Sequence, residues 1–332
     1  MKPRIVSTPK KTIPDRTYKI GCFYFPGWGT PCGGPADGGS SAAAWAYIPV
    51  GERPLKGAYN ENLPDVCDAQ LTEMRDFGLS FVVVDGYQRG GYPYLNHWID
   101  NALASSVVNK PKICAMYCEP SSTPQTLGGF ETYMDTVSSY ITNPDYFRID
   151  GRPVVFILPA DNFKTSVGGT TASVLTALTN ARNSTNYYFV GMGTNQTHLG
   201  NGPDSLKNAG YDAISYYNLP FGPPGTWAEL ERNYKSYFSR LAESTLPSIL
   251  PVSTGFDDRN WGLPYRNTLE TIEQFEAHLI NVKAYLDYSY DKNNGMAVIE
   301  AWNEYGEGGV LEPAVHNGGT ARGLKVKEIF GL

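Results

Sequence analysis

The sequence predicts an α/β fold, a single (β/α)8 barrel of the TIM type with long β-α loops. Eight short β-rich runs are spread along the 332 residues, and the segments between them have helical spacing of apolar residues. Strands that alternate with helices indicate parallel β-α units, and one closed barrel commonly uses a chain of this length. We expect an N-terminal extension over residues 1–16 and the barrel over residues 17–332.

The eight predicted strands are rich in β-branched and aromatic residues, as strands generally are. They cover residues 18–25, 79–85, 112–118, 153–158, 187–193, 211–217, 248–254 and 296–302.

The predicted helices lie between these strands. In the first, residues 64–77, Pro64 stands at a helix-start position, and Leu71, Met74 and Phe77 recur at a spacing of three. Similar patterns predict helices over residues 94–105, 130–141, 172–181, 227–241 and 271–285.

Composition argues against two kinds of partner. The 27 Lys and Arg are outnumbered by 33 Asp and Glu, so the net charge is -6 and no basic stripe is available to neutralise phosphates. We therefore expect no nucleic-acid partner. No apolar run approaches the roughly 18 to 20 residues that span a bilayer, so we expect no membrane partner. The sequence gives no indication of oligomeric state.

The N-terminal segment, residues 1–16, is basic and lacks the apolar stretch of a secretory signal. Localisation stays open between the cytoplasm and export with a signal already removed.

Cofactor motifs are absent from the sequence. The five cysteines are too few and too scattered for a disulfide framework, and Cys114 and Cys118 are expected to be buried on one strand face. The four histidines lack zinc-ligand spacing. The glycine pattern at residues 191–196 lacks the third glycine of a dinucleotide-binding turn. We expect neither a metal nor an organic cofactor.

Enzymes of this fold carry their chemistry at the carboxyl ends of the barrel strands. Polar and aromatic residues collect at those ends, and the loop over residues 27–63 is long enough to form a lid or a binding wall. The candidate substrate-binding residues are Tyr24, Trp28, Asp85, Tyr87, Tyr117, Glu119, Tyr217, Asn218, Asp257, Trp302 and Asn303.

Each of these candidates has a structural alternative. The aromatic residues, together with Trp45 and Trp261, suit sugar stacking but also ordinary packing. Asp257, followed by Asp258 and Arg259, also suits a surface ion pair.

Two carboxylates, Glu304 and Glu307, lie three residues apart just after the last predicted strand. Glycoside hydrolysis needs one carboxyl group to protonate the leaving oxygen and a second to act as nucleophile or base. Two nearby acids also raise the pKa of one of them, which keeps it protonated near neutral pH. The alternative is that both are solvated loop carboxylates.

Several motifs carry a family resemblance. Residues 299–308 read IEAWNEYGEG and are followed by Leu-Glu-Pro at 311–313, and further matching segments in the same order are residues 24–28, 54–59, 143–155, 211–214 and 254–257. Together they resemble the endo-α-mannosidase-like glycoside hydrolases of family 99 and the related WbsX-like proteins. The resemblance covers nearly the whole chain and implies a TIM barrel with retaining glycosidase chemistry.

The resemblance also implies roles for the two acids. Glu304 matches the glutamate that assists attack at the anomeric carbon, in family 99 by deprotonating the sugar 2-hydroxyl, and Glu307 matches the general acid and base. A direct nucleophilic role for Glu304 stays open. Glu119, before Pro120, resembles a sugar-binding Glu-Pro segment. Tyr305-Gly306 stands where family 99 has Trp-His, so its mannan substrate does not carry over.

We predict a retaining glycoside hydrolase that acts on a polysaccharide or oligosaccharide with Glu304 and Glu307. The alternatives are a glycosyltransferase of polysaccharide biosynthesis and a non-catalytic carbohydrate-binding barrel.

Overall fold

The strands and helices are described from a computed structural model. It describes residues 16–28, 45–89, 92–119, 126–193, 204–219, 225–262 and 271–332. The predicted extension over residues 1–16 and the loop over residues 27–63 therefore lie partly outside the described residues.

Eight parallel strands form the central sheet, in the order β8-β7-β6-β4-β2-β1-β10-β9. A parallel bridge between Ile214 and Ser248 connects its two ends, so the sheet is a nearly closed barrel, and the predicted fold class is confirmed. Each strand lies at a predicted run: β1 (Lys19–Tyr24), β2 (Phe81–Arg89), β4 (Lys112–Cys118), β6 (Arg152–Leu158), β7 (Tyr188–Gly193), β8 (Ala213–Tyr216), β9 (Leu250–Ser253) and β10 (Met296–Glu300).

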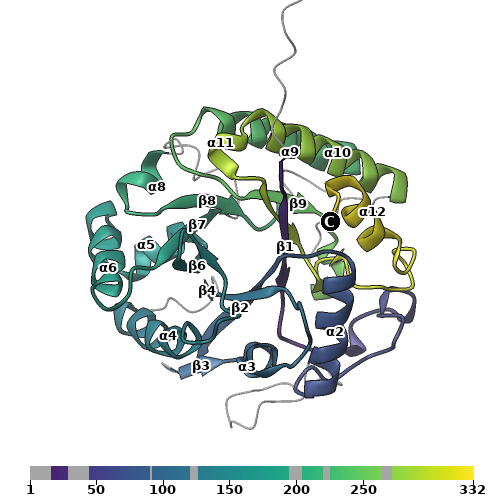
Figure 1. Ribbon diagram of the computed structural model, residues 1–332, viewed down its shortest axis with the longest axis horizontal. Helices are drawn as coiled ribbons and strands as arrows, with labels where there is room; N and C mark the ends of the chain where they lie inside the picture. Colours follow the sequence, from purple (N-terminus) through teal and green to yellow (C-terminus); the bar gives the residue numbers. More distant parts are fainter. Residues whose placement is uncertain are drawn as a thin grey trace, which may run out of the picture.

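Helices surround the strands, as Figure 1 shows. The six predicted helices are present as α2 (Pro64–Asp76), α3 (His97–Ala104), α4 (Leu127–Tyr140), α6 (Thr171–Ser184), α9 (Trp227–Glu243) and α10 (Ile272–Tyr288). The structure adds α5 (Ala160–Ser166), α8 (Asp204–Asn208), α11 (Tyr290–Asn293), α12 (Ala321–Phe330) and the 3-10 turns η1 (Val50–Glu52) and η2 (Asp258–Trp261).

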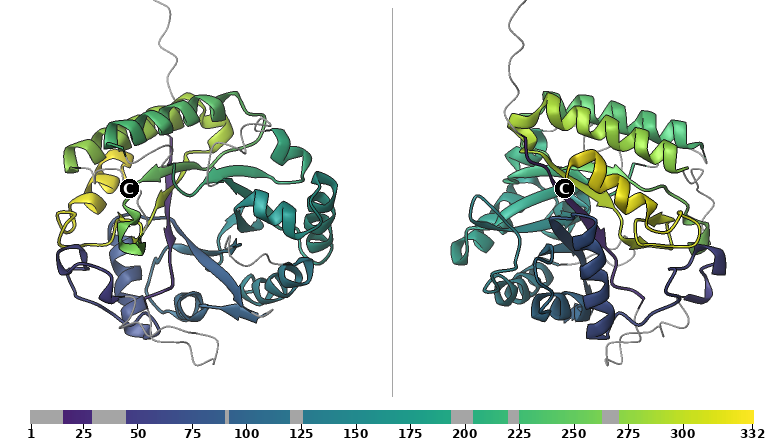
Figure 2. Two further views of the ribbon diagram at one scale, coloured as in Figure 1. Left: turned by 180° about the vertical axis from the view of Figure 1, so that it is seen from behind. Right: turned by 45° about the vertical axis from the view of Figure 1, so that its right-hand side comes forward.

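Local sequence signals fix where the helices begin. Pro64 lies in the first turn of α2, as expected from its lost N–H. The two longest helices, α9 and α10, begin with capping boxes in which Thr226 and Thr271 exchange hydrogen bonds with Glu229 and Gln274. These two helices lie side by side on the outside of the barrel (Figure 2).

Four short strands sit outside the barrel order. β3 (Tyr92–Tyr94) pairs antiparallel with β2, β5 (Arg148–Ile149) pairs with β6, and β11 (Asn303–Glu304) pairs with β12 (Gly309–Val310).

Two predicted strand ends are corrected by these pairings. β2 continues to Arg89 because β3 extends its hydrogen bonding, so Asp85 and Tyr87 lie within the strand. β10 ends at Glu300, two residues earlier than predicted, because the chain then turns into the β11–β12 hairpin, where Trp302 N donates to Phe23 O at 2.8 Å.

The barrel core is apolar and closely packed. Phe23 of β1 contacts Phe156 of β6 and the ring of Tyr217, with centroid separations of 6.1 and 4.8 Å. Cys114 and Cys118 are buried thiols, as predicted, and so are Cys22 and Cys67.

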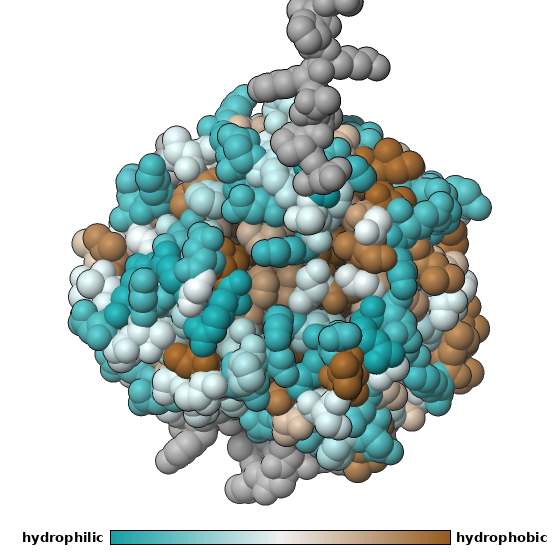
Figure 3. Space-filling view, in the orientation of Figure 1, coloured by the Kyte–Doolittle hydropathy of each residue, from teal (hydrophilic) through white to brown (hydrophobic). Residues whose placement is uncertain are grey.

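The outer surface mixes hydrophilic and hydrophobic residues on the face seen in Figure 3. Among the described residues, no helix has both the length and the apolar character needed to cross a bilayer.

Candidate active site

Acidic side chains from different strand ends meet at one end of the barrel. The Tyr217 hydroxyl, just after β8, lies 3.1 Å from Asp85 Oδ2 of β2 and 3.4 Å from Glu304 Oε1 of β11. Because this hydroxyl has one proton, it donates to one carboxylate at a time. Asp85 and Glu304 are 2% and 5% exposed, so Tyr217 brings two buried carboxyl groups together.

The two predicted catalytic glutamates lie on one short hairpin. Glu304 pairs with Gly309 across β11 and β12, and Glu307 N donates to Glu304 O at 3.1 Å within the connecting turn. Asp257 N donates to Glu307 O at 2.5 Å, which ties this turn to the segment after β9. The local fold thus holds Glu304 and Glu307 together.

Burial raises the pKa of both glutamates, because a low-dielectric environment disfavours the charged form. The pKa of Glu304 is held well above its usual range by burial and then by the neighbouring charges of Glu307, Asp85 and Glu300. The pKa of Glu307 rises to about 7 through burial and then the charge of Asp258. The pair therefore retains a proton at neutral pH, as acid catalysis requires.

Asp85 and Tyr87 belong to the same site. The pKa of Asp85 is raised by burial, with Glu307 adding to the rise and the Tyr217 hydrogen bond opposing it. The pKa of the half-buried Tyr87 is raised by burial and then by Asp85, with further contributions that include Glu304 and Glu307. Both residues of β2 thus face the two glutamates.

Glu300, the last residue of β10, is a member of this site that sequence reasoning missed. It is fully buried, and Asn218 Nδ2 donates to its Oε2 at 2.5 Å. A side chain at Gly309 would place its Cβ 2.1 Å from Glu300 Oε1, so only glycine fits there. The available signal was an acid at the end of the otherwise apolar run Met-Ala-Val-Ile-Glu.

Asn218 holds Glu300 in place. Its Nδ2 also reaches Gly255 O at 3.2 Å, and its Oδ1 accepts from Tyr234 Oη and Leu219 N, both at 2.9 Å. Both ends of this amide are bonded within the protein, which indicates a supporting position instead of the predicted sugar contact.

Tyr117 and Glu119 lie away from these acids, contrary to the expectation from sequence. The Tyr117 ring packs against Phe130 and Phe163 of the surrounding helices. Glu119 Oε2 accepts from Ser166 Oγ of α5 at 2.5 Å. Both side chains leave β4 on its helix-facing side, because residues two apart share one face of a strand.

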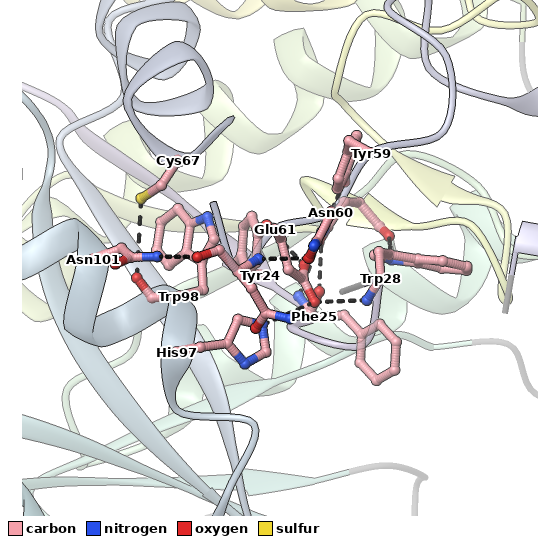
Figure 4. A network of polar contacts seen from close by, with 12 residues as sticks. Tyr24, Phe25, Trp28, Tyr59, Asn60, Glu61, Cys67, His97, Trp98 and Asn101 are labelled. Carbon is pink, nitrogen blue, oxygen red and sulfur yellow. Dashed lines mark hydrogen bonds and ion pairs between the residues drawn. The ribbon is translucent and has the colours of Figure 1, made fainter. Parts of the chain in front are cut away.

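Tyr24 and Trp28 join a second polar group, which we name the outer network: Tyr24, Tyr59, Glu61, Gln70, Tyr305 and Glu312. Tyr24 Oη lies 3.0 Å from Glu61 Oε2, and Glu61 Oε1 accepts from Trp28 N at 2.6 Å and lies 3.3 Å from His97 Nε2 (Figure 4). Trp28 is fully buried against Trp45. In the structure, Tyr24 and Trp28 are packed inside the protein, which is the structural alternative to sugar stacking.

Glu312 is the second acid of the outer network. Gln70 Nε2 donates to its Oε1 at 3.1 Å, and Tyr59 and Tyr305 donate to its Oε2 at 3.0 and 2.8 Å. Burial raises its pKa to about 7. Since Tyr305 lies between Glu304 and Glu307 in the chain, this network anchors the hairpin from behind.

Asn303 and Trp302 also have supporting positions. Asn303 Oδ1 accepts from Phe25 N and its Nδ2 donates to Phe25 O, both at 2.9 Å, which clamps the end of β1 to the hairpin. Trp302 is buried on the helix side, with its ring 6.2 Å from that of Phe77.

Asp257 forms the ion pair that the sequence offered as an alternative. Arg259 Nε donates to its Oδ1 at 2.6 Å, and Arg259 Nη2 contacts its Oδ2. The side chain of Trp261 lies outside the described residues.

Within the described ranges, no three acidic, histidine or cysteine side chains are grouped as a metal-binding set.

The fold resembles solved carbohydrate-processing enzymes. A family 99 endo-alpha-mannosidase from Bacteroides thetaiotaomicron, in complex with bis-tris propane, superposes with a TM-score of 0.65 at 17% identity, covering 95% of this chain and 97% of that one. A glycoside hydrolase-like protein gives the same score and identity, with 95% and 94% covered. At such identities the likeness shows the fold alone.

A family comparison is more specific. The family model described as glycosyltransferase WbsX matches residues 126–321, more than half of the chain, whereas no curated protein matches. The resemblance predicted from the motifs is confirmed: the chain belongs to the WbsX glycosyltransferase family.

Proposed function

We propose that this protein is a retaining glycoside hydrolase that cleaves a polysaccharide or oligosaccharide with Glu304 and Glu307. The observation that carries the proposal is the placement of both glutamates on one buried hairpin whose neighbours raise their pKa values. The likeness to solved glycoside hydrolases supports it at the level of the fold.

Glu307 is proposed as the general acid. Its pKa of about 7 leaves the carboxyl group about half protonated at neutral pH and protonated below it, and the protonated form delivers a proton to the glycosidic oxygen as the bond breaks. The resulting carboxylate then takes a proton from the incoming water, which regenerates the acid.

Glu304 is proposed to act at the anomeric carbon. It either attacks that carbon directly or removes the proton of the sugar 2-hydroxyl, whose oxygen then attacks. Asp85 and Glu300 lie near Glu304, and an acid that ionises in this site stabilises the positive charge that develops on the sugar ring in the transition state.

Substrate contacts are proposed for Asp85, Tyr87 and Tyr217. They share the site with the glutamates, and their carboxyl and hydroxyl groups match the hydrogen-bonding groups of a sugar. For Tyr24, Trp28, Tyr117, Glu119, Asn218, Asp257, Trp302 and Asn303, the contacts described above favour supporting roles.

The test is to incubate the protein with a panel of glycans in the absence of any nucleotide sugar and to detect products by mass spectrometry. Product release supports hydrolysis. The Glu307→Gln variant is expected to lose far more activity on substrates with poor leaving groups than on activated aryl glycosides, because only the former need protonation. Equal losses on both would remove Glu307 from the acid role.

Glu243→Gln is the matched control for that variant. Glu243 is an exposed residue at the end of α9, and the substitution removes the same charge outside the site. Its activity is expected to equal that of the unchanged protein.

Glycosyl transfer is the second candidate, because the matching family model carries that description. A product that forms only when a nucleotide sugar and an acceptor are both supplied favours transfer. Binding of a glycan without any product from either reaction favours a non-catalytic carbohydrate-binding barrel.

A further inference from the structure

The site concentrates acidic side chains. Asp85, Glu300, Glu304 and Glu307, which we name the carboxylate cluster, come from β2, β10 and the β11–β12 hairpin. Geometry connects them, since Tyr217 Oη lies within 3.4 Å of Asp85 and Glu304, and Glu300 lies against Gly309, the hairpin partner of Glu304. Four acids exceed the pair that the proposed catalysis requires, which raises the question of what the others recognise.

Two oxygens of the carboxylate cluster have no hydrogen bond. Asp85 Oδ1 and Glu304 Oε2 are buried, and each lacks a partner among the described residues. Their sister oxygens are the ones that face Tyr217. Buried acceptors without a donor are costly, so these two positions suit a donor that arrives with the ligand.

The segments that follow five of the eight barrel strands lack basic residues. The sequence has no Lys or Arg in residues 26–52, 119–126, 194–203, 217–226 and 301–320, which follow β1, β4, β7, β8 and β10, and the last of these ranges contains both proposed catalytic glutamates. The neighbouring charges that raise the pKa values of Asp85 and Glu304 are all carboxylates.

Several basic residues near these strand ends are engaged elsewhere. Arg53 donates to the backbone oxygens of Ile48 and Trp45, Lys56 pairs with Glu73, and Arg259 pairs with Asp257. The buried Arg322 donates to the backbone oxygens of Thr254 and Val310. These contacts engage all four cations with groups outside the carboxylate cluster.

We propose that the substrate is a glycan with a free amino group on the sugar that binds against Asp85 and Glu304. This inference rests on the proposed function and deepens it by naming the substrate class. A protonated amine offers three N–H donors, which match the two unpartnered oxygens, and a positive charge, which offsets the negative charge that burial of these acids disfavours. An N-acetylated sugar lacks that charge, and a uronic acid is repelled by the same carboxylates.

The experiment measures equilibrium binding by titration calorimetry and saturation-transfer NMR. The probes are the gluco, galacto and manno sugars, each as the free amine, the N-acetylated amine, the neutral hexose and the uronic acid. In at least one series we expect the amine to bind at least tenfold more tightly than its neutral and N-acetylated counterparts, with the uronic acid weakest.

Asp85→Asn is the test variant, because it removes one charge and keeps the size of the side chain. Its preference for the amine over the neutral sugar is expected to fall below threefold. Glu243→Gln, on the outer surface of α9, removes one charge elsewhere and should leave the preference unchanged. Far-ultraviolet circular dichroism and thermal unfolding of each variant verify that it is folded.

Three outcomes overturn the inference. These are equal binding of amine and neutral sugar in all three series, no detectable binding of any amine, and an amine preference that survives Asp85→Asn. The proposed function fails separately: an amine preference at Asp85 without any cleavage of amino glycans retains the binding site and rejects the hydrolase. Cleavage of glycans with no effect of amino groups retains the proposed hydrolase and rejects the preference for an amino sugar.

Discussion

The outer network and the carboxylate cluster are two buried groups of acidic residues. They differ in how completely their carboxyl oxygens are hydrogen-bonded. In the outer network, both oxygens of Glu61 and both oxygens of Glu312 accept hydrogen bonds from the protein. In the carboxylate cluster, Asp85 Oδ1 and Glu304 Oε2 accept none within the described residues. A saturated group stabilises the fold, whereas an unsaturated one retains capacity for a ligand.

The largest effect is expected for a variant of the carboxylate cluster, the group with unpartnered oxygens. Glu304→Gln should lower the hydrolytic rate about a thousandfold, because an amide neither attacks the anomeric carbon nor removes a proton. The free energy of unfolding should stay equal or increase, since a buried acid among like charges is lost. Initial rates and urea unfolding measure both. Retained activity would move the chemistry away from this residue.

The second prediction concerns the outer network, whose acids are fully hydrogen-bonded, and uses the pH dependence of stability. The pKa of Glu312 is about 7 in the folded protein and near 4.5 when exposed, so the folded state binds the proton more tightly. Its contribution to stability is full below pH 4.5 and is lost as the pH rises through 7, a change of about 3 kcal/mol. Urea unfolding at pH 5 and pH 8 should show this loss, and Glu312→Gln should reduce it.

For Glu312→Gln, the quantity to compare is the slope of the free energy of unfolding against pH. The absolute value is less informative, because Gln also changes the hydrogen bonds with Gln70, Tyr59 and Tyr305. An identical pH slope in the variant and the unchanged protein would show that Glu312 does not take up a proton on folding. Glycan cleavage by Glu312→Gln should stay within tenfold, because the residue is proposed only to anchor the hairpin.

Tyr217→Phe should have an intermediate effect. It removes the hydroxyl between Asp85 and Glu304, and we expect a ten- to hundredfold lower rate, about 1.4 to 2.7 kcal/mol in the activation barrier. The free energy of unfolding should fall by about 1 to 3 kcal/mol, because the buried carboxyl groups lose their hydroxyl donor. A rate within twofold of the unchanged protein would place Tyr217 outside the working site.

The smallest effect on the hydrolytic rate is expected for a variant of the outer network. Tyr24→Phe removes a hydroxyl of the outer network and should cost about 1 kcal/mol of unfolding free energy, because the one O–H that donates to either Glu61 or Gln70 is lost. The rate should stay within twofold. A rate loss as large as that of Tyr217→Phe would show that the two groups are one functional unit.

The strands were predictable because each is a short run of β-branched and aromatic residues between turn signals. The β11–β12 hairpin was harder to predict, because the end of β10 at Glu300 is followed by a turn that is hydrogen-bonded to Phe23 of β1. The short helices α5 and α8 were not predicted, because their few residues carry no helical periodicity.

The site residues show where sequence reasoning reaches its limit. Asp85 and Tyr87 within β2 face the acids, while Tyr117 of β4 and Glu119, which follows β4, face the helices, although each pair occupies alternate positions along the chain. The two-residue period says which side chains share a face, but which face points inward depends on the stagger of neighbouring strands.

The position of β10 between β1 and β9 has a consequence for biosynthesis. The ribosome delivers this strand and the following hairpin after every other barrel strand, yet the strand must insert between the first and the seventh to be made. Until then the emerging polypeptide has an open seam and lacks Glu300, Glu304 and Glu307 altogether. Closure of the barrel and completion of the proposed cutting machinery are therefore a single late event.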